Sequence, residues 1–121
     1  MKEKVLFYCK EGEGCAAAIL KAAAEQYDFP ISYEMERGCS AMNAGFGIGG
    51  FCGALVACIM VFGILFPKEE AKQKRLLFLM TFQERFCCFD CSVLSANRAD
   101  CMELMGEVGQ MLEAIIEEAR R

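Results

Sequence analysis

The 121-residue chain contains no histidine and no tryptophan. The missing histidine excludes a Cys-His or Ser-His catalytic pair and an imidazole metal ligand. It also excludes covalent c-type haem attachment, whose motif ends in histidine, so we expect no haem. Any chemistry must therefore use sulfur, carboxylate, amine or phenol groups.

Positive charge is also scarce. Lys and Arg number 13 against 17 Asp and Glu, which gives a net charge of −4 and a pI of about 4.9. The basic residues are scattered and form no stripe. Because binding to nucleic acid requires a basic patch that neutralises phosphates, we expect no nucleic-acid partner.

We also expect no export signal. The N-terminal stretch MKEKVLFYCKEGEG has only a short apolar run after its basic start, too short for the core of a signal peptide. The nine cysteines are odd in number, so at least one thiol would stay unpaired in a disulfide scaffold. We therefore expect a reducing, cytoplasmic location and thiols that are free, metal-bound or reversibly oxidised.

The length predicts one domain over 1–121. Hydrophobic residues make up 55 % of it, and the mean hydropathy is +0.27. Such a chain is tightly packed, oligomeric or associated with a membrane.

Hydrophobic residues recur at helical spacing, and no segment alternates convincingly at period two. The fold class that we predict is all-α, a compact bundle of four to five helices. We expect helices over 14–27, 69–86 and 101–119, a short helix or irregular connection over 31–44, and a loop or broken helix over 87–100.

The segment 45–66, GFGIGGFCGALVACIMVFGILF, is uncharged and admits three interpretations. A membrane span needs roughly 20 mostly apolar residues, and the strongly apolar part runs only from Phe51 to Phe66. Gly45, Gly47 and Gly50 match a dinucleotide-binding motif, but no strand precedes them as that motif requires. We favour a glycine turn that leads into a buried central helix, whose small residues let neighbouring helices approach closely.

Several segments resemble the C_GCAxxG_C_C family of small redox-active proteins, which is named for its cysteine pattern. They are GCAAAIL at 14–20, GFGIGG followed by CGAL at 52–55, FCCFDCSVL at 86–94, and Cys101 at the start of the last helix. The resemblance implies a helical domain with a redox role. It also implies that the four family cysteines are Cys15, Cys52, Cys91 and Cys101.

These four cysteines are the candidate site. They could hold an iron–sulfur cluster, which takes four thiolates, or they could cycle between dithiol and disulfide. A helix N-terminus lowers a thiol pKa, which makes Cys15 and Cys101 the best candidates for a nucleophile. A zinc site is less well supported, since Cys88-Phe-Asp-Cys91 is a single CxxC pair.

A packing role is the competing interpretation for cysteine, which often behaves as a small apolar residue. We expect Cys9, Cys39 and Cys58 to fill the core, and we assign no role to Cys87 and Cys88. The chain could instead be a non-catalytic module that forms a homo-oligomer through 101–119 or 51–66, or a membrane subunit. As a redox protein it would serve a partner protein, as an accessory to an oxidoreductase or a transporter.

Overall fold

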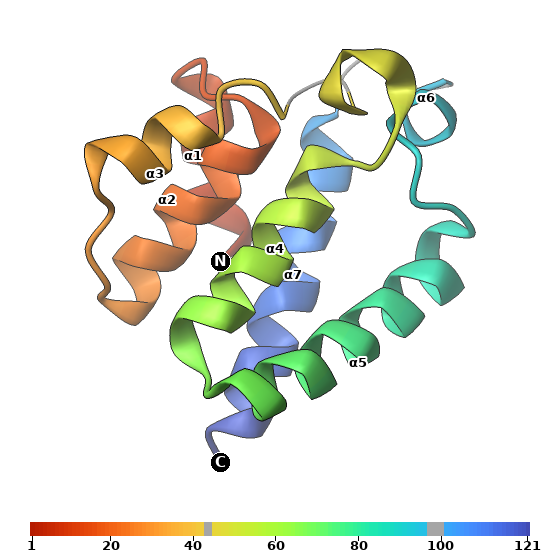
Figure 1. Ribbon diagram of the computed structural model, residues 1–121. Coiled ribbons are helices and arrows are strands. Elements are labelled where there is room, and N and C mark those ends of the chain that lie inside the picture. Colours follow the sequence, from red (N-terminus) through yellow and green to blue (C-terminus); the bar gives the residue numbers. More distant parts are fainter. Residues whose placement is uncertain (43–44, 97–100) are drawn as a thin grey trace.

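The computed structural model describes residues 1–42, 45–96 and 101–121 and is all-α within them (Figure 1). Its helices are α1 (Lys2–Lys10), α2 (Cys15–Tyr27), α3 (Tyr33–Gly38), α4 (Gly53–Leu65), α5 (Lys68–Phe86), α6 (Cys91–Leu94) and α7 (Met102–Ala119), together with one tight coil, η1 (Gly45–Gly49). The predicted fold class is confirmed. Of the predicted segments 31–44 and 87–100, residues 43–44 and 97–100 lie outside the described residues.

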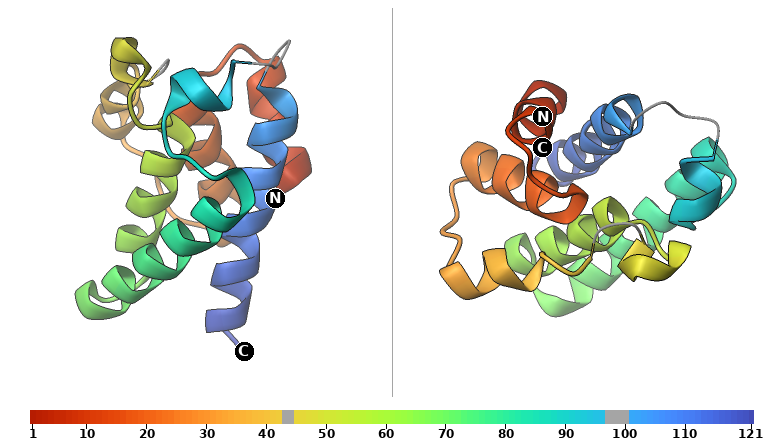
Figure 2. Two further views of the ribbon diagram at one scale, coloured as in Figure 1. Left: turned by 90° about the vertical axis from the view of Figure 1, so that its right-hand side faces the viewer. Right: turned by 90° about the horizontal axis from the view of Figure 1, so that it is seen from above.

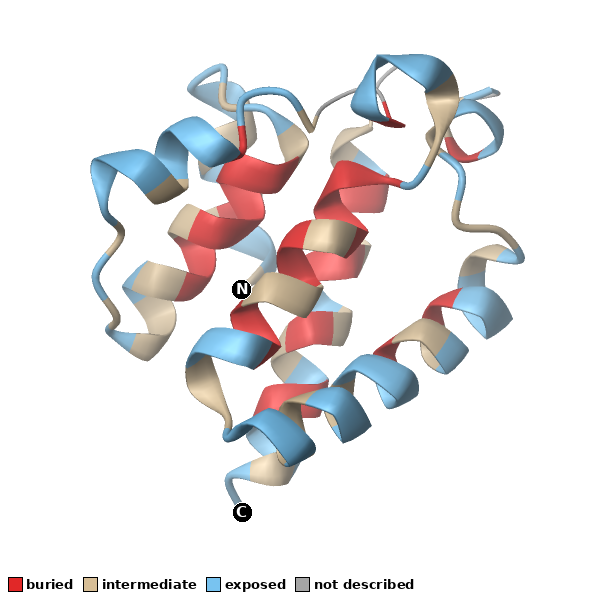
Figure 3. Cartoon of the chain, in the orientation of Figure 1, coloured by how far each residue is buried: buried red, intermediate tan, exposed pale blue. Residues whose placement is uncertain are grey.

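The core lies between α2, α4 and α7, whose facing sides are buried (Figure 3). The α2 and α4 helices pack against each other, and small residues are buried on both: alanines on α2, and Ala54, Ala57 and Cys58 on α4. Small side chains on both helices permit a close approach. A Cβ added at Gly53 would lie 2.7 Å from the carbonyl oxygen of Met42, so this position requires glycine. The predicted buried central helix is confirmed.

The α7 helix buries the predicted apolar stripe inside the chain, including Leu104, Val108, Leu112 and Ile116. The α1 helix, which the sequence interpretation did not predict, packs along it (Figures 1 and 2). A Cβ at Gly109 would lie 2.9 Å from Cγ2 of Val5, so glycine on α7 makes room for α1.

The α5 helix begins just after Pro67 and contributes only Phe78 and Phe82 to the buried core. The rings of Phe78 and Phe82 link α4 to the loop after α5. The centroids of Phe62 on α4 and Phe78 are 5.7 Å apart, and those of Phe82 and Phe89 in the loop are 5.9 Å apart. These contacts place the segment that leads to α6.

The segment 45–50 is a turn. Gly45 and Gly47 have positive φ, and the coil packs against α6. No helix in the described ranges is long and apolar enough to cross a membrane. Within residues 1–42, no strand precedes the glycines, as a dinucleotide-binding motif would need.

Candidate functional site

The four cysteines Cys15, Cys52, Cys91 and Cys101 each lie at the beginning of a different helix. Cys15 and Cys91 are the first residues of α2 and α6, and Cys52 and Cys101 immediately precede α4 and α7. The helices α2, α4 and α7 all begin at the upper end of the molecule in Figure 1. Their shared direction brings together cysteines that are far apart in the sequence.

All four cysteines line one small cavity of about 20 Å³. The remaining lining is mostly apolar and comes from Gly53, Leu94, Ser95, Leu104 and Met105. Cys52 is almost fully buried, at 4 % exposure, and the other three are partly buried. A cavity of this size holds about one water molecule, so the thiols surround a confined space.

A short antiparallel bridge fixes Cys52 and Cys91 relative to each other. The N–H of Cys52 donates to the carbonyl of Phe89 at 2.9 Å, and the N–H of Cys91 donates to the carbonyl of Gly50 at 2.7 Å. Phe51 and Asp90 are the bridge pair. Because side chains alternate along extended backbone, Cys52 and Cys91 project to the same side, which is the side of the cavity.

The glycine turn supports this bridge from behind. A Cβ at Gly45 would lie 2.4 Å from the backbone nitrogen of Gly50 and 2.9 Å from Cβ of Cys91. The N–H of Gly50 also donates to the carbonyl of Gly45 at 2.9 Å. The glycine-rich segment therefore positions one of the four cysteines.

Burial controls the electrostatics of the thiols. It is the largest cause that raises the pKa of Cys15 to about 12, and the neighbouring thiols, Cys52 first, act in the same direction. Burial also raises the pKa of Cys52, although the backbone amides of Leu55 and Ala54 oppose it. The expectation that a helix N-terminus lowers the pKa of Cys15 is therefore wrong, because desolvation outweighs the helix dipole here.

Four thiols are a suitable donor set for zinc or for an iron–sulfur cluster. Across the described ranges, however, no three Cys, Asp or Glu side chains are grouped so that they could hold a metal ion. As placed, the thiols are neighbours around a small cavity and not a preformed coordination shell.

The other five cysteines divide by position. Cys39 and Cys58 are buried, as expected of core residues, whereas Cys9 is only partly buried. Burial and the thiol of Cys101 raise the pKa of Cys9, so Cys9 neighbours the site, which the sequence interpretation missed. Cys87 is exposed and Cys88 is partly exposed.

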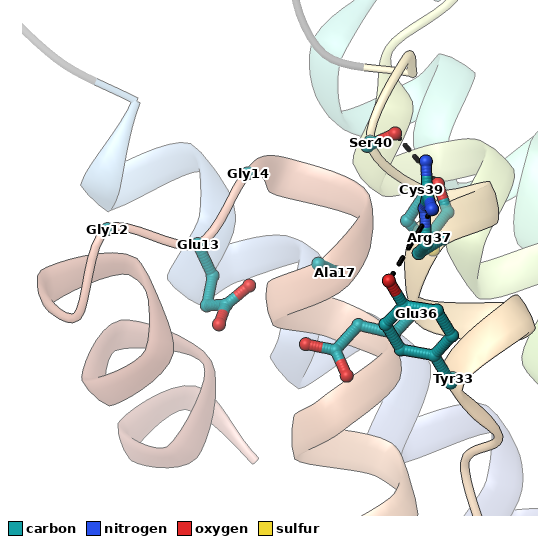
Figure 4. A pocket seen from close by; sticks show the side chains of 9 residues that line it. All are labelled: Gly12, Glu13, Gly14, Ala17, Tyr33, Glu36, Arg37, Cys39 and Ser40. Atoms are coloured by element: carbon teal, nitrogen blue, oxygen red, sulfur yellow. Dashed lines mark hydrogen bonds between the residues drawn. The ribbon is translucent and has the colours of Figure 1, made fainter.

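A larger pocket of about 470 Å³ lies between the 12–14 turn and α3 (Figure 4). Its lining includes Cys39 and none of the four site cysteines. The carboxylates of Glu13 and Glu36 at its edge both form ion pairs with Lys21, at 2.6 and 2.8 Å. This pocket is separate from the cysteine cavity.

No curated protein and no solved structure matches the chain. The sequence profile of one protein family, described as "Putative redox-active protein (C_GCAxxG_C_C)", matches residues 14–115. That span contains Cys15, Cys52, Cys91 and Cys101 and most of the helical core. The chain belongs to the C_GCAxxG_C_C family.

Proposed function

We propose that this chain is a thiol redox carrier whose centre consists of Cys15, Cys52, Cys91 and Cys101. The observation that carries the proposal is the convergence of these four cysteines, from four separate segments, on one confined cavity. Membership of a family described as redox-active supports it. A packing role alone gives no reason for four thiols to share one cavity.

The centre works by exchange between dithiol and disulfide. Two thiols of the set give up two electrons and two protons and form one S–S bond, and the disulfide of a partner protein accepts both and becomes two thiols. Cys52 and Cys91 are the favoured pair, because two backbone hydrogen bonds join their segments and both cysteines line the cavity. All nine cysteines are free thiols in the structure, and we place this carrier in a reducing compartment such as the cytoplasm.

The raised pKa values of Cys15 and Cys52 favour an uncharged disulfide over a buried thiolate, although they also lower the fraction of reactive thiolate. Burial opposes a negative charge on Cys15 and Cys52, whereas a disulfide is uncharged and carries no proton. Oxidation therefore removes S–H groups without leaving a buried charge. Of the four thiols, only that of Cys52 is almost fully buried, at 4 % exposure.

An iron–sulfur cluster or a zinc ion is the alternative form of the same centre. Its support is the donor set of four thiols. The cavity of about 20 Å³ would have to widen to accept a cluster. We therefore place the metal-free form first.

The test is an absorption spectrum of protein purified without oxygen, with iron, zinc and sulfide assayed on the same sample. The proposal predicts a colourless, metal-free protein with reversible thiol oxidation. That oxidation should disappear in the double variant Cys52→Ser/Cys91→Ser and persist in Cys39→Ser/Cys58→Ser, which removes two buried thiols outside the cavity. Charge-transfer bands with matching amounts of iron and sulfide would overturn the disulfide proposal and show that the centre holds an iron–sulfur cluster.

A second candidate function, self-association, is favoured by the outer face of α5. Leu76, Leu77 and Met80 are 60, 47 and 56 % exposed. Arg75 lies before them and Glu84 after them, and neither forms an ion pair within residues 1–42, 45–96 and 101–121. Two copies of α5 in antiparallel order would bring each Arg75 near the Glu84 of the other copy.

This surface differs from the one suggested by the sequence, because the apolar faces of 101–119 and 51–66 are largely buried inside the chain. Light scattering on a sizing column should show a dimer that Leu76→Glu converts to a monomer. Phe7→Glu, at another exposed apolar position, should leave the dimer intact. A monomeric wild-type protein would exclude self-association through α5.

A further inference from the structure

Cys88 has a position that the four-cysteine pattern does not explain. It lies three residues before Cys91, in the loop that joins α5 to α6. Cys91 lines the cavity, whereas Cys88 does not and is partly exposed. The CxxC pair thus has one thiol outside the centre and one thiol inside it.

The side chain of Cys88 points toward the beginning of α6. Its Sγ accepts the backbone N–H of Asp90 at 3.1 Å and lies 3.8 Å from the carbonyl oxygen of the same residue. Asp90 immediately precedes Cys91. The sulfur of Cys88 therefore lies against the backbone of Asp90, the residue that immediately precedes Cys91.

Anchors on both sides keep the loop in this conformation. The N–H of Cys87 donates to the carbonyl of Gln83 at 2.8 Å and closes α5. The ring of Phe89 packs on Phe82, and Asp90 pairs with Phe51 in the antiparallel bridge. A thiol held on a fixed loop exchanges with its neighbour at a high effective concentration.

We propose that Cys88 is the outer thiol of the centre, which receives oxidising equivalents from disulfides in solution and passes them to Cys91. This inference rests on the proposed function, since it supplies the route to the buried site. The thiolate of Cys88 attacks a disulfide RSSR, forms Cys88–S–S–R and releases one thiolate RS⁻.

Two internal exchanges complete the transfer. Cys91 attacks Sγ of Cys88, releases the second RS⁻ and forms the Cys88–Cys91 disulfide. Cys52 then attacks Sγ of Cys91, which leaves Cys88 as a free thiol and a disulfide between Cys52 and Cys91. In total, one RSSR becomes two RSH, and two protein thiols become one disulfide.

Cys87 provides the matched control. It is adjacent to Cys88 and more exposed, but its backbone has a φ of 65° as the left-handed cap of α5, and it lies outside the CxxC spacing. If exposure alone decided reactivity, Cys87 would be the receiving thiol.

The experiment uses oxidised glutathione as the probe, acid quenching at short times, and peptide mapping by mass spectrometry. In Cys91→Ser, glutathione should accumulate on Cys88, because the resolving thiol is gone. In Cys88→Ser, the Cys52–Cys91 disulfide should form at least about tenfold more slowly, since internal exchange from a tethered thiol is lost. Cys87→Ser should behave as the wild type.

The outcomes separate the two proposals. An unchanged rate in Cys88→Ser, or glutathione on Cys87 in place of Cys88 in Cys91→Ser, overturns the role of Cys88 and leaves the centre standing. A wild-type protein whose oxidation stops at Cys88–Cys91, with no disulfide inside the cavity, supports the outer thiol and overturns the centre.

Discussion

Cys52 and Cys91 flank one antiparallel bridge, and each donates its backbone N–H to the other's segment, at 2.9 and 2.7 Å. These two hydrogen bonds join the beginning of α4 to the beginning of α6. The relative position of the two thiols is therefore set by the backbone and not by their own side-chain contacts. Mutations that disturb this backbone should affect redox behaviour even where no cysteine is changed.

Gly45→Ala tests this dependence. Its Cβ would lie 2.4 Å from the nitrogen of Gly50, and φ is +60°, so we expect a loss of roughly 1–3 kcal/mol in the free energy of unfolding from overpacking, with backbone strain in addition. Disulfide formation at Cys91 should slow as well. Urea denaturation and thiol mapping measure the two effects.

Gly47→Ala is the matched control for Gly45→Ala. It also has positive φ, but a Cβ there would meet nothing within 4 Å. It should cost only about 1–2 kcal/mol of strain and leave the exchange rate unchanged. Equal effects on redox rate from both variants would show that the turn does not position Cys91.

The pH dependence of Cys15 follows from its burial. With its pKa raised to about 12, Cys15 should react with iodoacetamide in the folded protein only as the pH approaches that value. In the urea-unfolded chain it should react near the ordinary thiol pKa of about 8.5. A folded-state midpoint near 9 would contradict the buried environment.

The same shift predicts a stability change. Because the folded-state pKa exceeds the unfolded one, the stabilisation is complete below about pH 8.5 and is lost as the pH rises toward about 12. Burial also raises the pKa of Tyr27 to about 12, so both groups weaken the fold in this range. Cys15→Ala should reduce the alkaline loss of stability and leave the part due to Tyr27.

The close approach of the Met42 backbone to α4 predicts opposite effects at two glycines of this helix. Gly53→Ala would place its Cβ 2.7 Å from the carbonyl oxygen of Met42 and should destabilise by about 1–3 kcal/mol. Gly63→Ala meets nothing within 4 Å and should stabilise by about 0.5–1 kcal/mol through helix propensity. Thermal unfolding measures both, and a stabilised Gly53→Ala would contradict the packing described here.

Much of the fold could be predicted from local signals. Alanine content predicted the helix over 14–27, and periodic apolar residues predicted those over 69–86 and 101–119, which the structure has as Cys15–Tyr27, Lys68–Phe86 and Met102–Ala119. The α1 helix was not predicted, because only one of its residues, Val5, is buried and the segment therefore shows no apolar stripe. Its position depends on a tertiary contact, in which Val5 packs into the space that the absent side chain of Gly109 leaves on α7.

The site was only partly predictable, for a physical reason. The family resemblance picked out the four cysteines, and they line one cavity. The thiol pKa of Cys15 was predicted in the wrong direction, because helix position is visible in a sequence and desolvation is not. The bridge that aligns Cys52 with Cys91 pairs two short segments that show no alternation of their own.

The most direct test of the central claim is a redox equilibrium on metal-free protein. The protein is incubated in mixtures of reduced and oxidised glutathione, quenched in acid, and its thiols are labelled before and after reduction for peptide mapping. The account predicts one reversible disulfide within Cys15, Cys52, Cys91 and Cys101, while the buried Cys39 and Cys58 stay reduced. If those four remain free thiols at every ratio, the cavity is a packing feature and the account is wrong.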